Sequence, residues 1–243
     1  MRIAVLADIH GNYDALKAVL ADLRNIDMCV VLRDLVDYGP EPEEVFGAVR
    51  ELGCMSVRGN HDHAVAYGVD CGCGVRTHWV SVLTRKLISK KYLSKESIKY
   101  LRNMPLRLET YFGSWRALIV HATPSHPLHK YLYPWESTEK FREELAAWGE
   151  SRSADIALLA HTHHQFIRVV GGVLVVNPGS VGQPRDGDPR AAYALVDTES
   201  GEACLRRVKY DVSSTLTKLR ELLSSYVREY EFLGKVLLTG TLS

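Results

Sequence analysis

The sequence predicts an α/β fold in which short buried strands alternate with helices. Residues 2–7 and 28–32 are continuous apolar runs, as expected of strands that are covered on both faces. Residues 13–24 between them carry Leu and Val at spacings of three and four, which places an apolar stripe on one side of a helix. This strand, helix, strand order favours parallel strands joined by right-handed crossovers.

The composition is that of an ordinary soluble globular protein. Of the 243 residues, 46% are hydrophobic and 24% are charged. The net charge is only +1, so no overall field attracts nucleic acid or an anionic membrane. The apolar run before Asp8 is too short for a signal peptide, and no later run approaches the roughly 20 residues of a membrane span. We expect a cytoplasmic protein that binds neither nucleic acid nor membrane, and a homo-oligomer stays open.

The first half continues with a helix over 41–52 and a strand over 54–57. From 64 to about 104 the pattern becomes helical and basic, which indicates a helical insertion with Ser94 and Ser97 as candidate caps. Its basic side chains either meet a polyanionic substrate or form a solvated face, and the second interpretation is favoured. They are Arg76, Arg85, Lys86, Lys90 and Lys91.

The second half contains further strand-like runs and a helix over about 136–149. The runs cover 106–112, 115–120, 155–160, 165–170, 172–176, 191–197 and 204–210. The later ones follow one another through turn sequences, which is typical of antiparallel strands. From Asp211 the pattern is helical to a short tail. The lack of a linker or repeat in the sequence favours a single domain over 1–243.

The five cysteines favour reduced thiols. Cys29, Cys54 and Cys204 occur in apolar runs, where we expect buried, unpaired side chains. Cys71 and Cys73 in "DCGCG" are able to form a metal or redox pair. A CxC without a second pair is a weak signal, so a Gly-rich loop is the favoured interpretation.

Metal-competent side chains follow five of the predicted strands. The seven candidate ligands are Asp8, His10, Asp34, Asn60, His121, His161 and His163. Any one of them alone is more often a turn or cap residue. The carboxyl ends of parallel strands meet at one edge of a sheet, however, so all seven are expected to converge there.

The types of ligand indicate which metals fit. Nitrogen and oxygen ligands without a thiolate favour Mn, Fe, Zn, Ni or Co, of which we expect Mn. Seven ligands that include a bridging carboxylate suit two divalent ions. A pair of ions about 3.5 to 4 Å apart is the arrangement that clamps the oxygens of a phosphoryl transfer.

The motifs "DIH", "RDLVDYGP", "GNHD", "VHA" and "AHTH" resemble the calcineurin-like metallophosphoesterase family. The stretch "NPGSVGQPRDGDPRAAYALVD" over 177–197 extends the resemblance toward small prokaryotic and archaeal phosphodiesterases. The resemblance implies a four-layer α-β-β-α sandwich of two mixed sheets with flanking helices. It also implies hydrolysis of a small phosphorylated or nucleotide substrate, through attack by a hydroxide between two metal ions.

The resemblance assigns a role to each candidate residue. One metal would be held by Asp8, His10, Asp34 and His163. The other would be held by Asp34, Asn60, His121 and His161, so Asp34 would bridge the two ions.

Further roles concern catalysis and substrate. His61 would act as the acid beside the leaving oxygen, and Asp37 would hold its imidazole. The predicted substrate contacts are Arg185, Asn60 and Tyr38. Tyr38 stands where phosphoprotein phosphatases of this superfamily carry Arg, which disfavours phosphoprotein substrates.

Two other residues of these motifs have expected structural effects. Asp62 is expected to cap the next helix. Arg33 precedes the bridging Asp34 where the family usually has Gly, a residue that permits close backbone approach and unusual torsions. Arg33 therefore either strains this turn or directs its guanidinium toward the phosphate.

The sequence leaves four functions open. A phosphodiesterase is favoured, and the alternatives with the same metals are a phosphomonoesterase and a dinucleoside polyphosphate hydrolase. The fourth is a binding or regulatory protein in which Arg33 has weakened the metal site.

Overall fold

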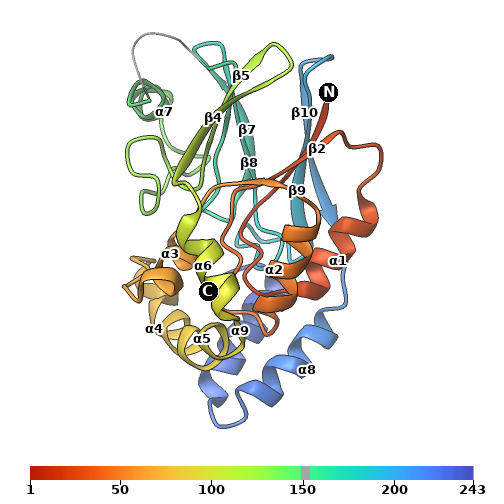
Figure 1. Cartoon of the computed structure of the whole chain (residues 1–243), viewed down its shortest axis with the longest axis vertical. Helices are drawn as coiled ribbons and strands as arrows, with labels where there is room; N and C mark the ends of the chain where they lie inside the picture. Colours follow the sequence, from red (N-terminus) through yellow and green to blue (C-terminus); the bar gives the residue numbers. More distant parts are fainter. Residues whose placement is uncertain (149–153, 243) are drawn as a thin grey trace.

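Two five-stranded sheets face each other in the computed structural model, which describes residues 1–148 and 154–242 (Figure 1). The first sheet has the order β10-β9-β1-β2-β3. Its strands are β1 (Arg2–Leu6), β2 (Met28–Val31), β3 (Met55–Ser56), β9 (Ala191–Asp197) and β10 (Glu202–Val208). β1, β2 and β3 are parallel, as predicted, and β9 pairs with β1 in the antiparallel sense.

The second sheet has the order β4-β5-β6-β8-β7. Its strands are β4 (Arg107–Phe112), β5 (Trp115–Val120), β6 (Ile156–Leu158), β7 (Gln165–Val170) and β8 (Val173–Pro178). β5, β6 and β8 are parallel, whereas the two edge strands are antiparallel to their neighbours. Both sheets are therefore mixed.

Helices cover the outer faces of the two sheets. Side chains alternate along β1, so that Ile3 and Val5 pack toward the second sheet while Ala4 and Leu6 pack outward. The outward side chains meet α1 (Tyr13–Asp22) and α2 (Pro42–Glu51). On the other side, Phe141 of α7 (Thr138–Ala146) packs on the second sheet. The predicted four-layer sandwich is confirmed.

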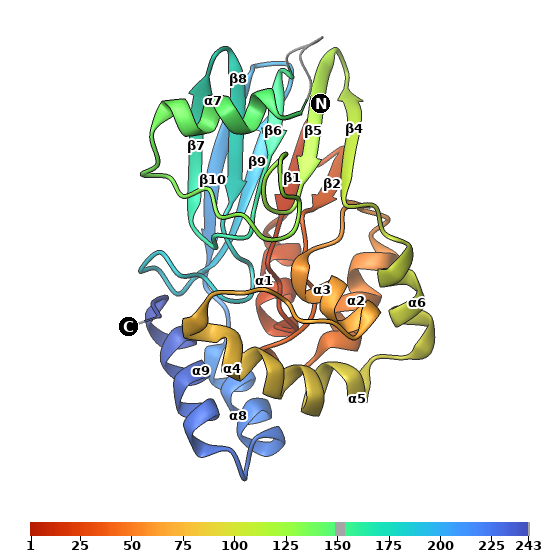
Figure 2. The same ribbon diagram turned by 90° about the vertical axis from the view of Figure 1, so that its left-hand side faces the viewer.

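The remaining helices gather beyond the ends of β1 and β2 (Figure 2). Those from the predicted insertion are α3 (Asn60–Tyr67), α4 (Val75–Thr84), a π-helical turn (Arg85–Ser89), α5 (Lys90–Tyr92) and α6 (Lys95–Asn103). The C-terminal ones are α8 (Val212–Leu222) and α9 (Val227–Thr239). Val80 and Ile88 pack against α8 and α9, so the insertion and the C-terminal helices form one layer. None of the helices in the described residues is long and apolar enough to cross a membrane.

Some predicted boundaries were wrong. The helical insertion begins at Asn60 instead of residue 64, and the C-terminal region forms two helices. α7 ends at Ala146, and the predicted helix end at 149 lies outside the described residues. Ser94 caps α6 by accepting from the backbone N–H of Ser97. Ser97 is not a cap, because its hydroxyl donates instead to Glu43.

The cysteine predictions were partly wrong. Cys29 and Cys54 form a disulfide. The parallel register of β2 and β3 pairs Val30 with Met55, so the two preceding positions are brought together as well. Cys204 is exposed on the edge strand β10 instead of buried.

Candidate active site

The structure brings the seven predicted metal ligands and His61 together beneath the helical layer. Asp8 and His10 follow β1, Asp34 follows β2, His121 follows β5, and the other two histidines follow β6, while Asn60 and His61 open α3. Each of these side chains is at most 4% exposed. Ligands from both sheets therefore meet in one buried centre at the strand ends.

Two imidazoles face each other on one side of this centre. His10 Nδ1 donates to the carbonyl of Val36 at 2.8 Å, and His163 Nδ1 donates to the carbonyl of Gln183 at 2.6 Å. Because a carbonyl only accepts, both Nδ1 atoms carry the proton and both Nε2 atoms present a lone pair. These Nε2 atoms are 3.3 Å apart, and Asp8 Oδ1 lies 3.9 Å from His163 Nε2. The two Nε2 atoms have no proton to share, which fits a cation beside them and the Asp8 carboxyl.

A second group of acceptors lies beside His121. Its Nδ1 donates to the carbonyl of Leu32 at 2.9 Å, so its Nε2 also presents a lone pair. That Nε2 lies 3.1 Å from Asn60 Oδ1 and 3.5 Å from Asp34 Oδ2. The Asn60 amide nitrogen donates to the carbonyl of Cys71 at 2.8 Å, which leaves its oxygen directed at His121.

His161 completes this second group. Its Nδ1 lies 3.2 Å from His121 Nε2, and its backbone N–H donates to Asp8 at 3.1 Å. Its Nε2 is buried and has no hydrogen-bond partner within residues 1–148 and 154–242. An unpaired buried nitrogen is costly unless something else coordinates or bonds it.

Asp34 belongs to both groups. Its Oδ2 faces His121, and one of its oxygens also falls within 4.8 Å of ligand atoms of His10. Its Oδ1 accepts from the first backbone N–H groups of α3, those of His61 at 2.9 Å and Asp62 at 3.2 Å. A Cβ on Gly59 would collide with this carboxylate, so the close approach requires glycine.

The electrostatics of the centre favour a bound cation. Burial raises the pKa of Asp8 to about 8, and burial together with the Asp62 and Asp8 carboxyls raises that of Asp34 well above its usual range. Burial lowers the pKa of His121 to about 3, so this imidazole is neutral. Neutral imidazoles beside carboxylates that lack a compensating charge form a donor set that suits divalent transition-metal ions.

His61 lies beside this donor set, and its imidazole contacts Asp37. His61 Nδ1 is 2.8 Å from Asp37 Oδ2. The same carboxylate accepts from Arg85 Nη2 at 2.6 Å and Nε at 3.0 Å, and its other oxygen accepts from Ser89 at 2.9 Å. Arg85 therefore does not belong to a solvated face, because it is buried and paired with Asp37. Sequence reasoning missed this role of Arg85 and Ser89.

Arg33 points away from the ligands. Its side chain is fully buried, its Nη2 donates to the sulfur of Met104 at 3.0 Å, and its Nε lies 3.9 Å from Asp62. Its guanidinium is therefore not directed toward the ligand set, where one interpretation of the sequence places a contact with phosphate. The alternative expectation, strain in this turn, is supported because Arg33 has a backbone φ of +63°, in the left-handed region that residues other than glycine rarely adopt.

Asp62 does not cap α3, contrary to expectation. Its Oδ1 accepts from the backbone N–H of Leu35 at 3.0 Å, and its other oxygen faces Arg33. The N-cap of α3 is Gly59. Asp62 instead ties the loop after β2 to the start of α3.

Arg185 and Tyr38, two predicted substrate contacts, lie beside the centre, and Arg185 also lines an open cleft. Arg185 Nη2 donates to Gln183 at 2.6 Å, and its guanidinium carbon is 5.7 Å from the centre of the Tyr38 ring. Tyr38 is only 2% exposed and packs edge-on against His10, while its hydroxyl lies 3.5 Å from His61 Nε2. Arg185 is thus the more accessible of the two.

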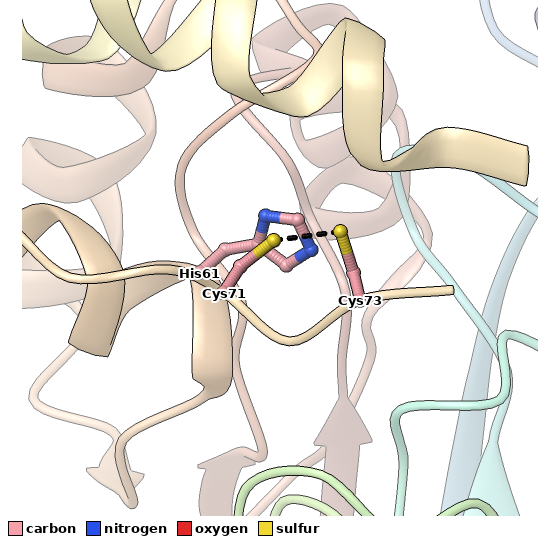
Figure 3. Close-up of side chains that lie close together, drawn as sticks. All are labelled: His61, Cys71 and Cys73. Atoms are coloured by element: carbon pink, nitrogen blue, oxygen red, sulfur yellow. Dashed lines mark hydrogen bonds between the residues drawn. The ribbon is translucent and has the colours of Figure 1, made fainter. Parts of the chain in front are cut away.

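A pair of thiols also lies next to His61 (Figure 3). The sulfurs of Cys71 and Cys73 are 2.6 Å apart, and both are 3.4 Å from the hydroxyl of Ser81. Both sulfurs and a nitrogen of His61 lie within 4.8 Å of one another. The "DCGCG" motif was noticed in the sequence, but no spacing there connects it with His61.

Comparisons with known proteins agree with this geometry. The family model for the calcineurin-like phosphoesterase superfamily domain matches residues 1–201. An uncharacterized protein of Methanocaldococcus jannaschii is 32% identical over 96% of this chain and 98% of its own length.

Two solved structures have the same fold over nearly the whole chain. A metallophosphoesterase from Sphaerobacter thermophilus is 31% identical, with a TM-score of 0.78 over 99% of this chain and 100% of its own. A hypothetical protein from Pyrococcus horikoshii is 25% identical, with a TM-score of 0.80 over 98% of each chain. The family match and the full-length relative together show that this chain belongs to the calcineurin-like phosphoesterase superfamily, a family of metal-dependent hydrolases.

Proposed function

We propose that the protein hydrolyses phosphodiesters with two divalent metal ions, of which Mn is favoured. One ion would be held by Asp8, His10, Asp34 and His163, and the other by Asp34, Asn60, His121 and His161. The observation that carries this proposal is the pair of ligand groups that share Asp34. In each group the two closest atoms are both hydrogen-bond acceptors, and no proton lies between them. When bound, such ions neutralise phosphoryl oxygens and lower the pKa of the attacking water.

His61 supplies a proton in this proposal. The carboxylate of Asp37 accepts from His61 Nδ1, which leaves Nε2 for the leaving oxygen. Arg85 neutralises Asp37, so this carboxylate orients the imidazole and does not compete for its proton. The role of Asp37 is therefore positional.

The distribution of arginines supports a diester over a monoester. Arg85 is paired with Asp37, and Arg33 faces Asp62, so neither is free to bind phosphate. Within the described part of the chain Arg185 is bound to Gln183 and to no carboxylate, and it borders the centre. One guanidinium suits the single charge of a diester better than the dianion of a monoester.

The position of Arg33 also bears on the hypothesis of a non-catalytic binding protein. That hypothesis rested on damage to the metal site by Arg33. Its guanidinium lies with Met104 and Asp62 instead of with the ligand set. The ligand set is complete beside it, which favours an enzyme.

The test is a substrate panel on protein reconstituted with Mn, Fe, Zn, Ni or Co, combined with metal analysis. We expect close to two ions per chain and faster hydrolysis of aryl phosphate diesters than of the matched monoesters. Faster monoester turnover would overturn the diester preference. Less than one tightly held ion per chain, with no hydrolysis of either ester, would overturn the proposal as a whole.

A further inference from the structure

Three aromatic side chains form a row on the segment between β5 and α7. Tyr131, Tyr133 and Trp135 are two positions apart, and side chains at this spacing in extended chain point to the same side. The rings of Tyr131 and Tyr133 are 5.6 Å apart with 5° between their planes. Those of Tyr133 and Trp135 are 4.7 Å apart with 8° between their planes.

The row begins at the metal centre and ends in solvent. The ring of His161, a proposed ligand, stacks on Tyr131 at 4.1 Å. Trp135 at the far end is 67% exposed.

A cleft of about 610 Å³ runs along the row, which is within the usual range of small-molecule sites. The three aromatic residues line it together with Arg76, Arg185 and His164. His164 packs edge-on against Tyr133 at 5.5 Å and against Trp135 at 5.2 Å. The rings are therefore held in place before a ligand arrives, which lowers the entropic cost of binding.

The combination of flat rings and cations in the cleft indicates the chemistry of the ligand. Because the rings stack on one another, the surface open to another flat ring is the outer face of Trp135. A cage for a quaternary ammonium group would need rings on several sides. Arg185, which borders the centre, suits the phosphate of the substrate, and Arg76 adds positive charge to the same cleft. A nucleotide carries both a flat ring and phosphate.

We propose that this cleft binds the base of a nucleotide substrate, stacked at the Tyr133 and Trp135 end of the row. The inference rests on the proposed function, because it puts the scissile phosphodiester at the metal centre beside His161. Sequence reasoning missed this surface. Its one signal was the "YLYPW" spacing of aromatic residues after His121.

The test compares two substrates that differ only in the base, the methyl ester of adenosine 5′-monophosphate and the methyl ester of ribose 5-phosphate. The wild type should have the higher kcat/KM for the adenosine ester. Trp135→Ala should lower the ratio of the two kcat/KM values about tenfold, in line with the loss of one base stack. Trp135→Phe should retain most of the ratio.

Tyr111→Ala is the matched control, because Tyr111 is also an exposed aromatic residue but lies on the edge strand β4. It should leave both kcat/KM values unchanged. An unchanged ratio in Trp135→Ala, or an equal loss in Tyr111→Ala, would overturn the inference. So would equal losses for the two esters, because the row would then contact the sugar.

Equilibrium dialysis against protein without added metal separates this inference from the proposed function. Adenosine 5′-monophosphate should bind more tightly than ribose 5-phosphate, and Trp135→Ala should remove most of that difference. If neither ester is hydrolysed but this difference is found, the diesterase proposal fails and the base site stands. If the esters are hydrolysed but no difference in binding is found, the base site fails alone.

Discussion

The proposed metal centre and the aromatic cleft are adjacent, but the chain holds their side chains in different ways. In the centre, His10, His121 and His163 each donate to a backbone carbonyl, and each is at most 3% exposed. In the cleft, Tyr133 and Trp135 stand on a loop and are held by ring contacts. The groups proposed to react are thus fixed at the ends of strands, whereas the proposed base site lies on a loop that is able to vary without disturbing the sheets.

This contrast predicts much larger effects from changes in the centre than from changes in the cleft. In the cleft a substitution removes one stacking contact, which should lower kcat/KM for the adenosine ester about tenfold relative to the ribose ester. In the centre a substitution removes a ligand or a proton donor, and each of these acts directly on the reacting atoms.

Asp34→Asn is expected to have the largest effect. The amide keeps an oxygen that accepts from the N–H groups of His61 and Asp62, so the start of α3 should remain intact. The substitution removes the negative charge of Asp34, however, which both ligand groups share. We expect metal content to fall and kcat to drop by roughly a thousandfold or more.

Metal analysis and steady-state kinetics on the same preparation check this prediction. Asp70→Asn, at an exposed carboxylate on the loop before α4, is the matched control and should retain both metal and activity. Two ions per chain with normal kcat in Asp34→Asn would contradict the bridging role.

His61→Ala should have the next largest effect. His61 donates its backbone N–H to Asp34 but contributes no side-chain atom to the two proposed ligand groups, so both ions should remain bound. Loss of a positioned proton donor is expected to lower kcat roughly 100- to 10,000-fold. If metal analysis instead found the ions missing, His61 would belong to the ligand set.

Asp34 was recognisable in the sequence for a physical reason, whereas the role of His61 came only from the family resemblance. A strand that ends on Asp8 or Asp34 puts that residue at a known edge of the sheet, whatever the details of packing. The order of the strands does not place β5 in a second sheet, so the meeting of His121 with Asp34 across the two sheets was implied only by the resemblance.

Arg85 and the Cys29–Cys54 disulfide were not recognisable in this way. Arg85 reaches Asp37 only because a helix of the insertion lies over the strand ends, and locally it resembles the exposed lysines around it. The disulfide depends on the register between β2 and β3, which the apolar pattern of two short strands does not specify. Both contacts depend on how distant parts of the chain pack together, which the local sequence pattern does not specify.

Arg33→Gly should affect stability and leave the reaction intact. Glycine relieves the positive φ at this position but leaves Asp62 as a buried carboxylate without its cation. We expect the free energy of unfolding to fall by about 3 kcal/mol, at the low end for breaking a buried pair. Metal content should not change, because the guanidinium does not face the ligands.

Urea unfolding and metal analysis test this prediction, and a second substitution tests its cause. In Arg33→Gly/Asp62→Asn the buried charge is gone, so much of the lost stability should return. Higher metal content in Arg33→Gly would show instead that Arg33 weakens the metal site.

The smallest predicted effect concerns an ion pair outside the proposed ligand set, which connects α8 with α1 and the start of α2. Lys218 Nζ is 2.8 Å from Asp14 Oδ2 and 2.8 Å from Glu41 Oε2. Burial alone raises the pKa of Asp14, but hydrogen bonds from Lys218, Lys17 and Ser214 outweigh it and lower the pKa to about 2. Because the folded-state pKa is below the unfolded value, the carboxylate stabilises the protein above about pH 4.

That stabilisation should disappear as the pH falls from about 4 to about 2. We expect it to amount to about 1 to 2 kcal/mol, since Lys218 is partly exposed and solvent screens the pair. Urea unfolding of the wild type and of Asp14→Asn should differ by this amount at pH 7 and converge near pH 2. Kinetics of Asp14→Asn should match the wild type, because Asp14 anchors a helix and touches neither the metal centre nor the aromatic cleft. A stability difference that persisted at pH 2 would mean that Asp14 acts through its packing and not through its charge.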